Sequence, residues 1–201
     1  MKKIMINDRY GLTKAVLYGR KTMTRRIIKG EFEKITAFST TYGWYYDGET
    51  KDGETIEIQP QYWEGEKVAV AQPYKDTDVL SFNAYLPDGL KRHKEMLSSA
   101  GYRNKMFVKA EYMPHRIRIT NIKVERLRDI SEEDCMKEGI MEGEFMNTWD
   151  TFYFDMWGDV PNHITFKTPH EAFASLIDRI SGKGTWERNP WVYAYEFELI
   201  K

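Results

Sequence analysis

The sequence predicts an α+β fold with a mixed, mostly antiparallel sheet that curls into a small β-barrel, with short flanking helices. Many short segments alternate apolar and polar residues, as half-buried strands do. Short helices interrupt them without the regular strand–helix alternation of a parallel α/β fold. The 201 residues are 41% hydrophobic and 14% aromatic, which is enough for one compact domain with its own core.

The N-terminal segment predicts a short strand followed by a helix. Lys3–Ile6 has the character of a strand, and the apolar residues within 12–16 then recur at helical spacing. Asn7 or Asp8 is expected to cap this helix, because both side chains accept hydrogen bonds from the free amides of a first turn. Gly19 is expected to end it.

Residues 30–62 predict one or two hairpins. Polar and aromatic residues alternate there, and the turn dipeptides Asp47-Gly48 and Asp52-Gly53 interrupt them. Lys67–Ala71 has the short apolar character of a buried strand. Gln72-Pro73 is expected to end this strand, since proline cannot donate a hydrogen bond to a neighbouring strand.

The central region divides into an irregular part and a long strand. Residues 75–104 show no sustained pattern apart from a short helix over Leu90–Ala100. From Arg116 to Leu127 apolar and polar residues alternate, with one change of phase at Asn121. This change predicts a β-bulge or a tight bend.

Two helices and a strand complete the predicted fold. Ser131 is expected to cap a short helix that Gly139 ends. Thr168 is expected to cap a longer helix, with proline at the first helical position and glutamate three residues after the cap. Trp191–Ile200 predicts a long strand, whose second half has one buried and one solvent-exposed face.

Composition excludes several classes of protein. The 30 Lys and Arg residues against 31 Asp and Glu residues leave a net charge of −1, which argues against a strong non-specific nucleic-acid binder. The single cysteine, Cys135, permits neither an internal disulfide nor a thiolate-rich zinc site. No apolar run is long enough for a membrane span, and no signal-like segment precedes the first charges. We therefore expect a cytoplasmic protein that does not bind membranes.

The sequence also predicts neither a metal site nor a cofactor. The four histidines show none of the spacings that bind zinc, and no carboxylate is placed to complete a set of ligands. The GxSxG elbow of serine hydrolases, the GxxxxGK[ST] phosphate loop and the GxGxxG dinucleotide fingerprint are all absent from the sequence.

The segment from Gly19 to Arg26 brings together an amine, a hydroxyl and a guanidinium in the pattern Gly-x-Lys21-x-x-Thr24-x-Arg26. These groups can bind an anion or a phosphate, since arginine offers a planar fork and lysine a point charge. Alternatively, a desolvated, neutral Lys21 can take the hydroxyl proton while Thr24 attacks a carbonyl. A solvated basic turn without a function explains the same pattern.

The aromatic residues of segment 145–157 admit two interpretations. Their rings can stack on unpaired bases. They can also form a small satellite core beneath a loop. We favour the second interpretation, because acidic residues among the aromatic ones weaken the case for binding an anion.

The segment Gly19-Arg20-Lys21-Thr22-Met23-Thr24-Arg25-Arg26 resembles the GxKxxTxR signature of ASCH domains, relatives of the RNA-binding PUA fold. Residues 65–74 resemble the strand that follows this signature. Residues 113–134 resemble a stretch found in phage- and prophage-encoded ASCH-like proteins, and 189–198 resemble their C-terminal strand.

The resemblance leaves three segments unexplained within a single domain of residues 1–201. These predicted insertions are residues 29–62, 75–101 and 141–167.

The resemblance implies a PUA-like β-barrel with a cleft beside the signature that binds RNA or nucleotides. One branch of the family is an amidohydrolase that removes the acetyl group from N-acetylated cytidine with a lysine, a threonine and a glutamate. Lys21 and Thr24 match the first two of these residues. Gln72 stands in place of the glutamate, and a neutral carboxamide cannot act as a general base. Glu66 and Glu111 are nearby alternative carboxylates.

These observations lead to three hypotheses. In the first, the chain binds RNA or a nucleoside-like ligand beside the signature, where Arg26 contacts phosphate, Gln72 hydrogen-bonds and Tyr74 stacks. In the second, it is an amidohydrolase of an acylated nucleoside, with the threonine as nucleophile and the lysine as its base, and glutamate at position 72 would raise turnover. In the third, a phage-associated protein binds a protein partner through segment 145–157.

Overall fold

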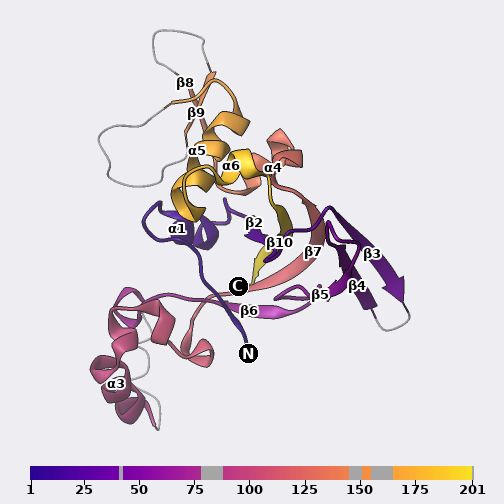
Figure 1. Cartoon of the computed structure of the whole chain (residues 1–201). Helices are drawn as coiled ribbons and strands as arrows, with labels where there is room; N and C mark the ends of the chain where they lie inside the picture. The colour runs from indigo at the N-terminus through magenta and orange to yellow at the C-terminus, as the bar shows by residue number, and fades with distance from the viewer. Residues whose placement is uncertain (41–42, 78–87, 145–150, 155–164, 201) are drawn as a thin grey trace.

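The computed structural model describes residues 1–40, 43–77, 88–144, 151–154 and 165–200, and it shows a mixed α+β protein (Figure 1). In the five-stranded main sheet, β1 runs parallel to β6 and the other neighbouring strands are antiparallel. The prediction of an α+β fold with a mostly antiparallel sheet is therefore confirmed. The spatial order of the strands is β1 (Lys3–Ile4), β6 (Lys67–Val70), β7 (Arg116–Arg126), β10 (Trp191–Ile200) and β2 (Met23–Ile27).

Four helices gather on the side of the sheet where β2 and β10 lie (Figure 1). The main core includes Ile117 and Val192 from the sheet and Phe173 and Leu176 from one of these helices. This arrangement places helices next to β2, the strand that contains Thr24, Arg25 and Arg26. The four helices are α1 (Leu12–Leu17), α4 (Glu132–Lys137), α5 (Pro169–Ser181) and α6 (Thr185–Arg188).

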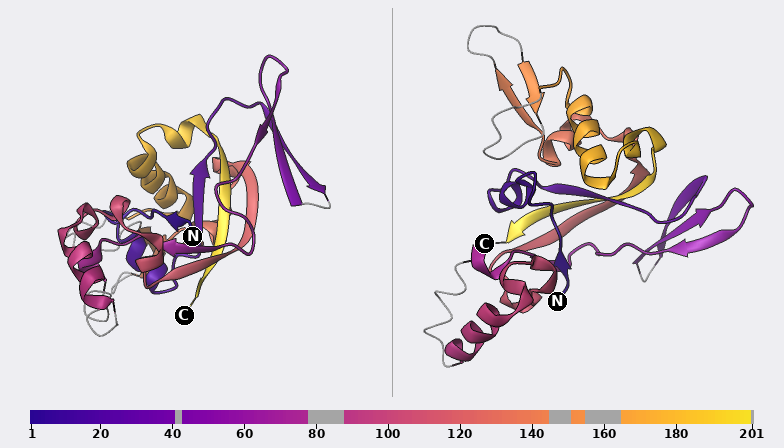
Figure 2. Two further views of the ribbon diagram at one scale, coloured as in Figure 1. Left: turned by 90° about the horizontal axis from the view of Figure 1, so that it is seen from below. Right: turned by 60° about the vertical axis from the view of Figure 1, so that its left-hand side comes forward.

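Three further segments lie outside the main sheet. A three-stranded antiparallel sheet projects from the body of the molecule (Figure 2). The helix α3 (Gly89–Ser98) contributes Met96 to a second, smaller core. A separate hairpin pairs β8 (Met141–Glu144) with β9 (Thr151–Phe154). The projecting sheet consists of β3 (Lys34–Thr40), β4 (Gly43–Glu49) and β5 (Thr55–Ile58).

The aromatic segment 145–157 lies outside the described residues, apart from the backbone of β9. The described part of the chain contains no helix that is both long enough and apolar enough to cross a membrane.

The first helix begins differently from the sequence prediction. The N-cap of α1 is Gly11, at φ 66°, and no side chain caps the helix. Asn7 and Asp8 are not caps, because a turn closed by the Gly11 amide and the Asp8 carbonyl (3.0 Å) separates both side chains from the helix. Asp8 accepts a hydrogen bond from the Thr13 hydroxyl instead.

The two turn dipeptides of residues 30–62 have different outcomes. Asp52-Gly53 lies in the turn between β4 and β5, with Gly53 at φ 81°. Asp47-Gly48 lies inside β4, so the prediction of a turn there is wrong. A Cβ atom at Gly48 would lie only 2.4 Å from the Phe32 ring, so this glycine makes room for an aromatic side chain.

The predicted irregularity of β7 and the predicted helix caps at Ser131 and Thr168 are confirmed. Glu196 pairs with Asn121 and Phe197 with Ile119, which leaves Thr120 as the extra residue of a bulge. The hydroxyls of the two capping residues accept hydrogen bonds from the third residue of their helices. The two bonds join Asp134 N to Ser131 Oγ (3.1 Å) and Glu171 N to Thr168 Oγ1 (3.2 Å).

Cys135 offers a test of this packing. It lies in α4 with no exposed surface, and burial raises the pKa of its thiol to about 12. Because the thiolate is the reacting form, we expect the native protein to react with a disulfide reagent such as DTNB far more slowly than the urea-unfolded chain. The chain has one cysteine, so absorbance reports this site alone. Rapid release of one equivalent from the native protein would contradict the buried position.

Candidate functional site

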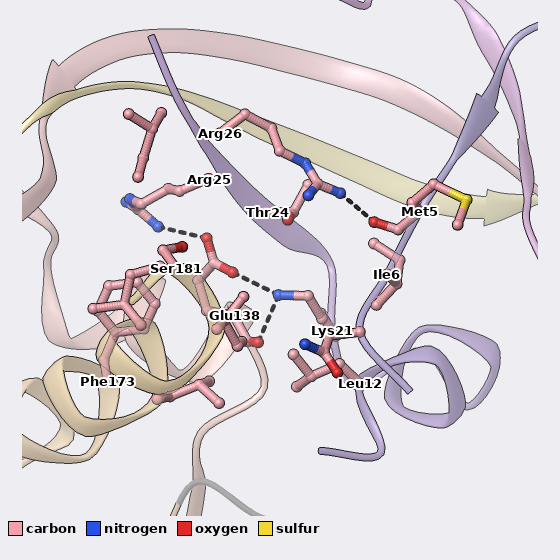
Figure 3. A pocket seen from close by; sticks show the side chains of 15 residues that line it. Met5, Ile6, Leu12, Lys21, Thr24, Arg25, Arg26, Glu138, Phe173 and Ser181 are labelled. Atoms are coloured by element: carbon pink, nitrogen blue, oxygen red, sulfur yellow. Dashed lines mark hydrogen bonds and ion pairs between the residues drawn. The ribbon is translucent and has the colours of Figure 1, made fainter. Parts of the chain in front are cut away.

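A cavity of about 230 Å³ lies between β2, the residues that follow β1, and the helices α1 and α5 (Figure 3). Its wall has a polar and an apolar part. The polar residues are Asn7, Lys21, Thr24, Arg25, Arg26, Glu138 and Ser181. The apolar residues are Met5, Ile6, Leu12, Ile27, Phe173, Leu176, Ile177 and Ile180.

Lys21 and Thr24 both line this cavity, and neither lies in a solvated turn. Lys21 lies two residues before β2 begins, and Thr24 is in the strand. Their exposed fractions are 3% and 6%. The Lys21 amide bonds to the Ala15 carbonyl of α1 (3.1 Å), and the Thr22 amide bonds to the Lys137 carbonyl of α4 (2.9 Å). These bonds fix the start of β2 between two helices.

Glu138 supplies the carboxylate that meets Lys21. The Lys21 Nζ atom donates to Glu138 Oε2 at 2.5 Å and to the Glu138 carbonyl oxygen at 2.6 Å (Figure 3). Burial lowers the pKa of Lys21, and the charge and hydrogen bond of Glu138 partly offset this shift. Both side chains are buried, so their interaction is only weakly screened by solvent.

Gly139 allows this close approach. It follows Glu138 at the end of α4 and has φ 107°, a conformation that favours glycine. A Cβ atom there would lie 3.2 Å from Leu12 Cδ2 and 3.8 Å from the Lys21 side chain.

Arg25 holds the other oxygen of the Glu138 carboxylate. Its Nη1 atom donates to Glu138 Oε1 at 3.2 Å, and its Nη2 atom donates to Glu125 Oε1 at 2.6 Å and Asp134 Oδ2 at 3.1 Å. The Glu138 carboxylate is thus clamped between Arg25 and Lys21, as Figure 3 shows. We refer to Lys21, Arg25, Glu125, Asp134 and Glu138 as the buried charge network.

Arg26 and Thr24 have free bonding capacity toward the cavity. Arg26 Nη2 donates to the Met5 carbonyl, which links the edge strand β2 to the residues after β1 at the other edge of the sheet. Within the described residues, Arg26 forms no ion pair with a carboxylate, and no hydrogen bond engages the Thr24 hydroxyl. A ligand in the cavity can therefore meet one uncompensated cation and one unengaged hydroxyl.

The structure places the other two predicted ligand-binding residues elsewhere. Neither Gln72 nor Tyr74 is among the described residues that line the cavity. Tyr74 is 2% exposed, packs in the second core and accepts a hydrogen bond from the Lys109 amide, so its ring offers no face to a base. Gln72 is also buried, and its Oε1 atom lacks a partner among the described residues. After β6 the chain turns toward α3 instead of toward β2, which explains both positions.

Glu138 is the functional candidate that the sequence did not reveal. The alternatives Glu66 and Glu111 do not line the cavity, and Glu66 is paired with Lys2 at 3.1 Å. Glu138 is 117 residues from Lys21 in the chain, and no motif connects the two. The one local signal was Gly139, which correctly predicted that a helix ends there.

Among the described residues, no three His, Cys, Asp or Glu side chains are grouped so that they could hold a metal ion. Comparison of the chain with known proteins finds no matching family model, curated protein or solved structure.

Replacing Arg25 tests the buried charge network. In Arg25→Met, three carboxylates lose their shared cation, and we expect the free energy of unfolding to fall by about 3–5 kcal/mol, the usual loss when one partner of a buried ion pair is removed. Urea denaturation measures this change.

The matched control is Lys51→Met, which breaks the exposed ion pair with Glu31 and should change stability little. Equal effects of the two substitutions would show that the network contributes no special stability.

Proposed function

We propose that the cavity binds an acylated nucleoside and hydrolyses its amide bond. The observation that carries this proposal is the buried contact between Lys21 Nζ and Glu138 Oε2, in a cavity that Thr24 also lines. The resemblance to ASCH domains, with their PUA-like barrel, supports a nucleoside-like ligand.

The charges around the cavity favour a neutral ligand over a phosphate. Lys21 and Arg25, two of the three cations in the wall, already face the carboxylates of the buried charge network. An additional anion would have to compete with these carboxylates. The remaining cation, Arg26, is suited to bind one carbonyl oxygen and to stabilise the negative charge that develops on it.

In the proposed first step, the Thr24 oxygen bonds to the amide carbon while its proton passes to the unprotonated amine of Lys21. Lys21 then gives this proton to the amide nitrogen as the carbon–nitrogen bond breaks. The acyl group remains on Thr24 as an ester, and the free nucleoside leaves.

Water completes the reaction. It attacks the ester and gives one proton to Lys21, which returns it to Thr24 as the carboxylic acid is released. Glu138 orients the amine during both steps, because it accepts hydrogen bonds from Lys21 through its carboxylate and through its carbonyl oxygen. It thus takes the place of the glutamate for which this chain has Gln72.

Turnover of N-acetylated cytidine, followed by chromatography, tests the proposal. We expect hydrolysis by the wild type and a loss of about 10²–10⁴-fold in Lys21→Met, which removes the base. Thr24→Val removes the nucleophile with little change of shape and should be equally inactive. Hydrolysis at the wild-type rate by both variants would overturn the proposed roles of Lys21 and Thr24. Absence of hydrolysis by the wild type toward a panel of acylated nucleosides would overturn the proposed activity.

Gln72 supplies the matched control. Because its side chain does not line the cavity, Gln72→Ala should retain wild-type turnover, and Gln72→Glu should not raise it. A large increase of turnover in Gln72→Glu would show that the catalytic carboxylate belongs at position 72, and it would contradict the role of Glu138.

The pH dependence tests the state of Lys21. Only the unprotonated amine can accept the Thr24 proton, so kcat/KM should rise with pH and level off above the pKa of Lys21, which burial sets below 10.5. The negative charge of Glu138 raises this pKa. Glu138→Gln should therefore move the rising limb to lower pH while it lowers the maximal rate. A shift to higher pH would contradict the proposed coupling.

A further inference from the structure

Half of the apolar residues in the cavity wall come from one face of α5. Phe173, Leu176, Ile177 and Ile180 all line the cavity, and their spacing of three and four residues places them along one stripe of the helix. The first three belong to the buried core, whereas Ile180 is only partly buried. An acetyl group has a single methyl carbon with which to cover this surface.

The proposed chemistry fixes which part of an amide faces this stripe. The departing nitrogen must lie near Lys21, because Lys21 returns the proton to it. The other substituent of the carbonyl carbon, the acyl chain, then points away from Lys21. In Figure 3, Phe173 of α5 lies across Glu138 from Lys21, on the side toward which the chain would extend.

We propose that α5 forms an acyl pocket, and that the preferred substrates are nucleoside amides of aliphatic acids longer than acetic acid. This inference rests on the proposed hydrolysis and adds its substrate class. Each methylene that leaves water for an apolar wall contributes about 0.8 kcal/mol, which corresponds to a factor of about four. The polar residues of the cavity hold the amide, and the helix selects the chain.

A series of cytidines that carry acetyl, propionyl, butyryl and hexanoyl groups on the same nitrogen tests the inference. We expect kcat/KM to rise about fourfold for each added methylene until the cavity is full. Hydrolysis of the acetyl compound with a flat or falling series would overturn the acyl pocket and leave the hydrolase standing. Absence of hydrolysis of every member would overturn both the acyl pocket and the proposed hydrolase.

A substitution in the stripe separates chain selection from general damage. Ile180→Phe narrows the cavity at its partly buried edge, and it should lower the ratio of hexanoyl to acetyl turnover at least fourfold. Ile35→Phe makes the same exchange at a partly buried isoleucine that does not line the cavity, and it should leave the ratio unchanged. An unchanged ratio in Ile180→Phe, or an equal change in both variants, would contradict the pocket.

Binding can be measured apart from turnover. In the non-hydrolysing Thr24→Val protein, hexanamide should raise the Tm more than acetamide at equal concentration, because its longer chain binds the native state more tightly. Equal shifts, or none, would count against the acyl pocket even if the wild type hydrolyses acetylated cytidine.

Discussion

The buried carboxylate of Glu138 is the constraint on which the rest of the site depends. A charge removed from water is tolerated only when partners compensate it, and here each of its two oxygens meets a different cation. Because Lys21 and Arg25 lie on either side of the same carboxylate, the start of β2 has little freedom to shift. Thr24 lies between Lys21 and Arg25 in the sequence, so the contacts of these two cations with Glu138 also hold Thr24 in place at the cavity wall.

The network also unites elements that the sheet alone would not hold together. Arg25 is on an edge strand, Glu125 belongs to β7, and Asp134 and Glu138 come from α4 and its end. Charged pairs in the interior demand defined geometry, whereas apolar packing tolerates small displacements. The same groups that cost solvation therefore hold Lys21 in a defined position, which the proposed proton transfer to it would require.

Sequence patterns predicted the parts of the fold whose signals are local. The cap at Thr168, the change of phase at Asn121 and the apolar segment of β6 each reflect a preference that acts over a few residues. Gly48 misled because a glycine that makes room for Phe32 looks the same in the sequence as a glycine in a turn.

The same distinction explains the candidate site. Lys21, Thr24 and Arg26 could be proposed from the sequence because they lie close together in the chain, just before β2 and within it. Glu138 could not be found, since its meeting with Lys21 depends on how α4 packs against the start of β2. Gln72 and Tyr74 were assigned by analogy of position, and the path of the chain after β6 places them in other surroundings.

The pairing of β2 has a consequence for how the protein is made. This early strand forms its ladder with β10, the final strand described, so that Thr24 lies opposite Tyr195. During synthesis, Lys21 and Arg25 leave the ribosome long before their carboxylates and before the strand that must flank them. Contacts so distant in the chain form slowly, because a large loop has to close first. The candidate site is consequently incomplete until β2 has paired with β10, and deletion of β10 would disrupt it without removing Lys21, Thr24 or Arg26.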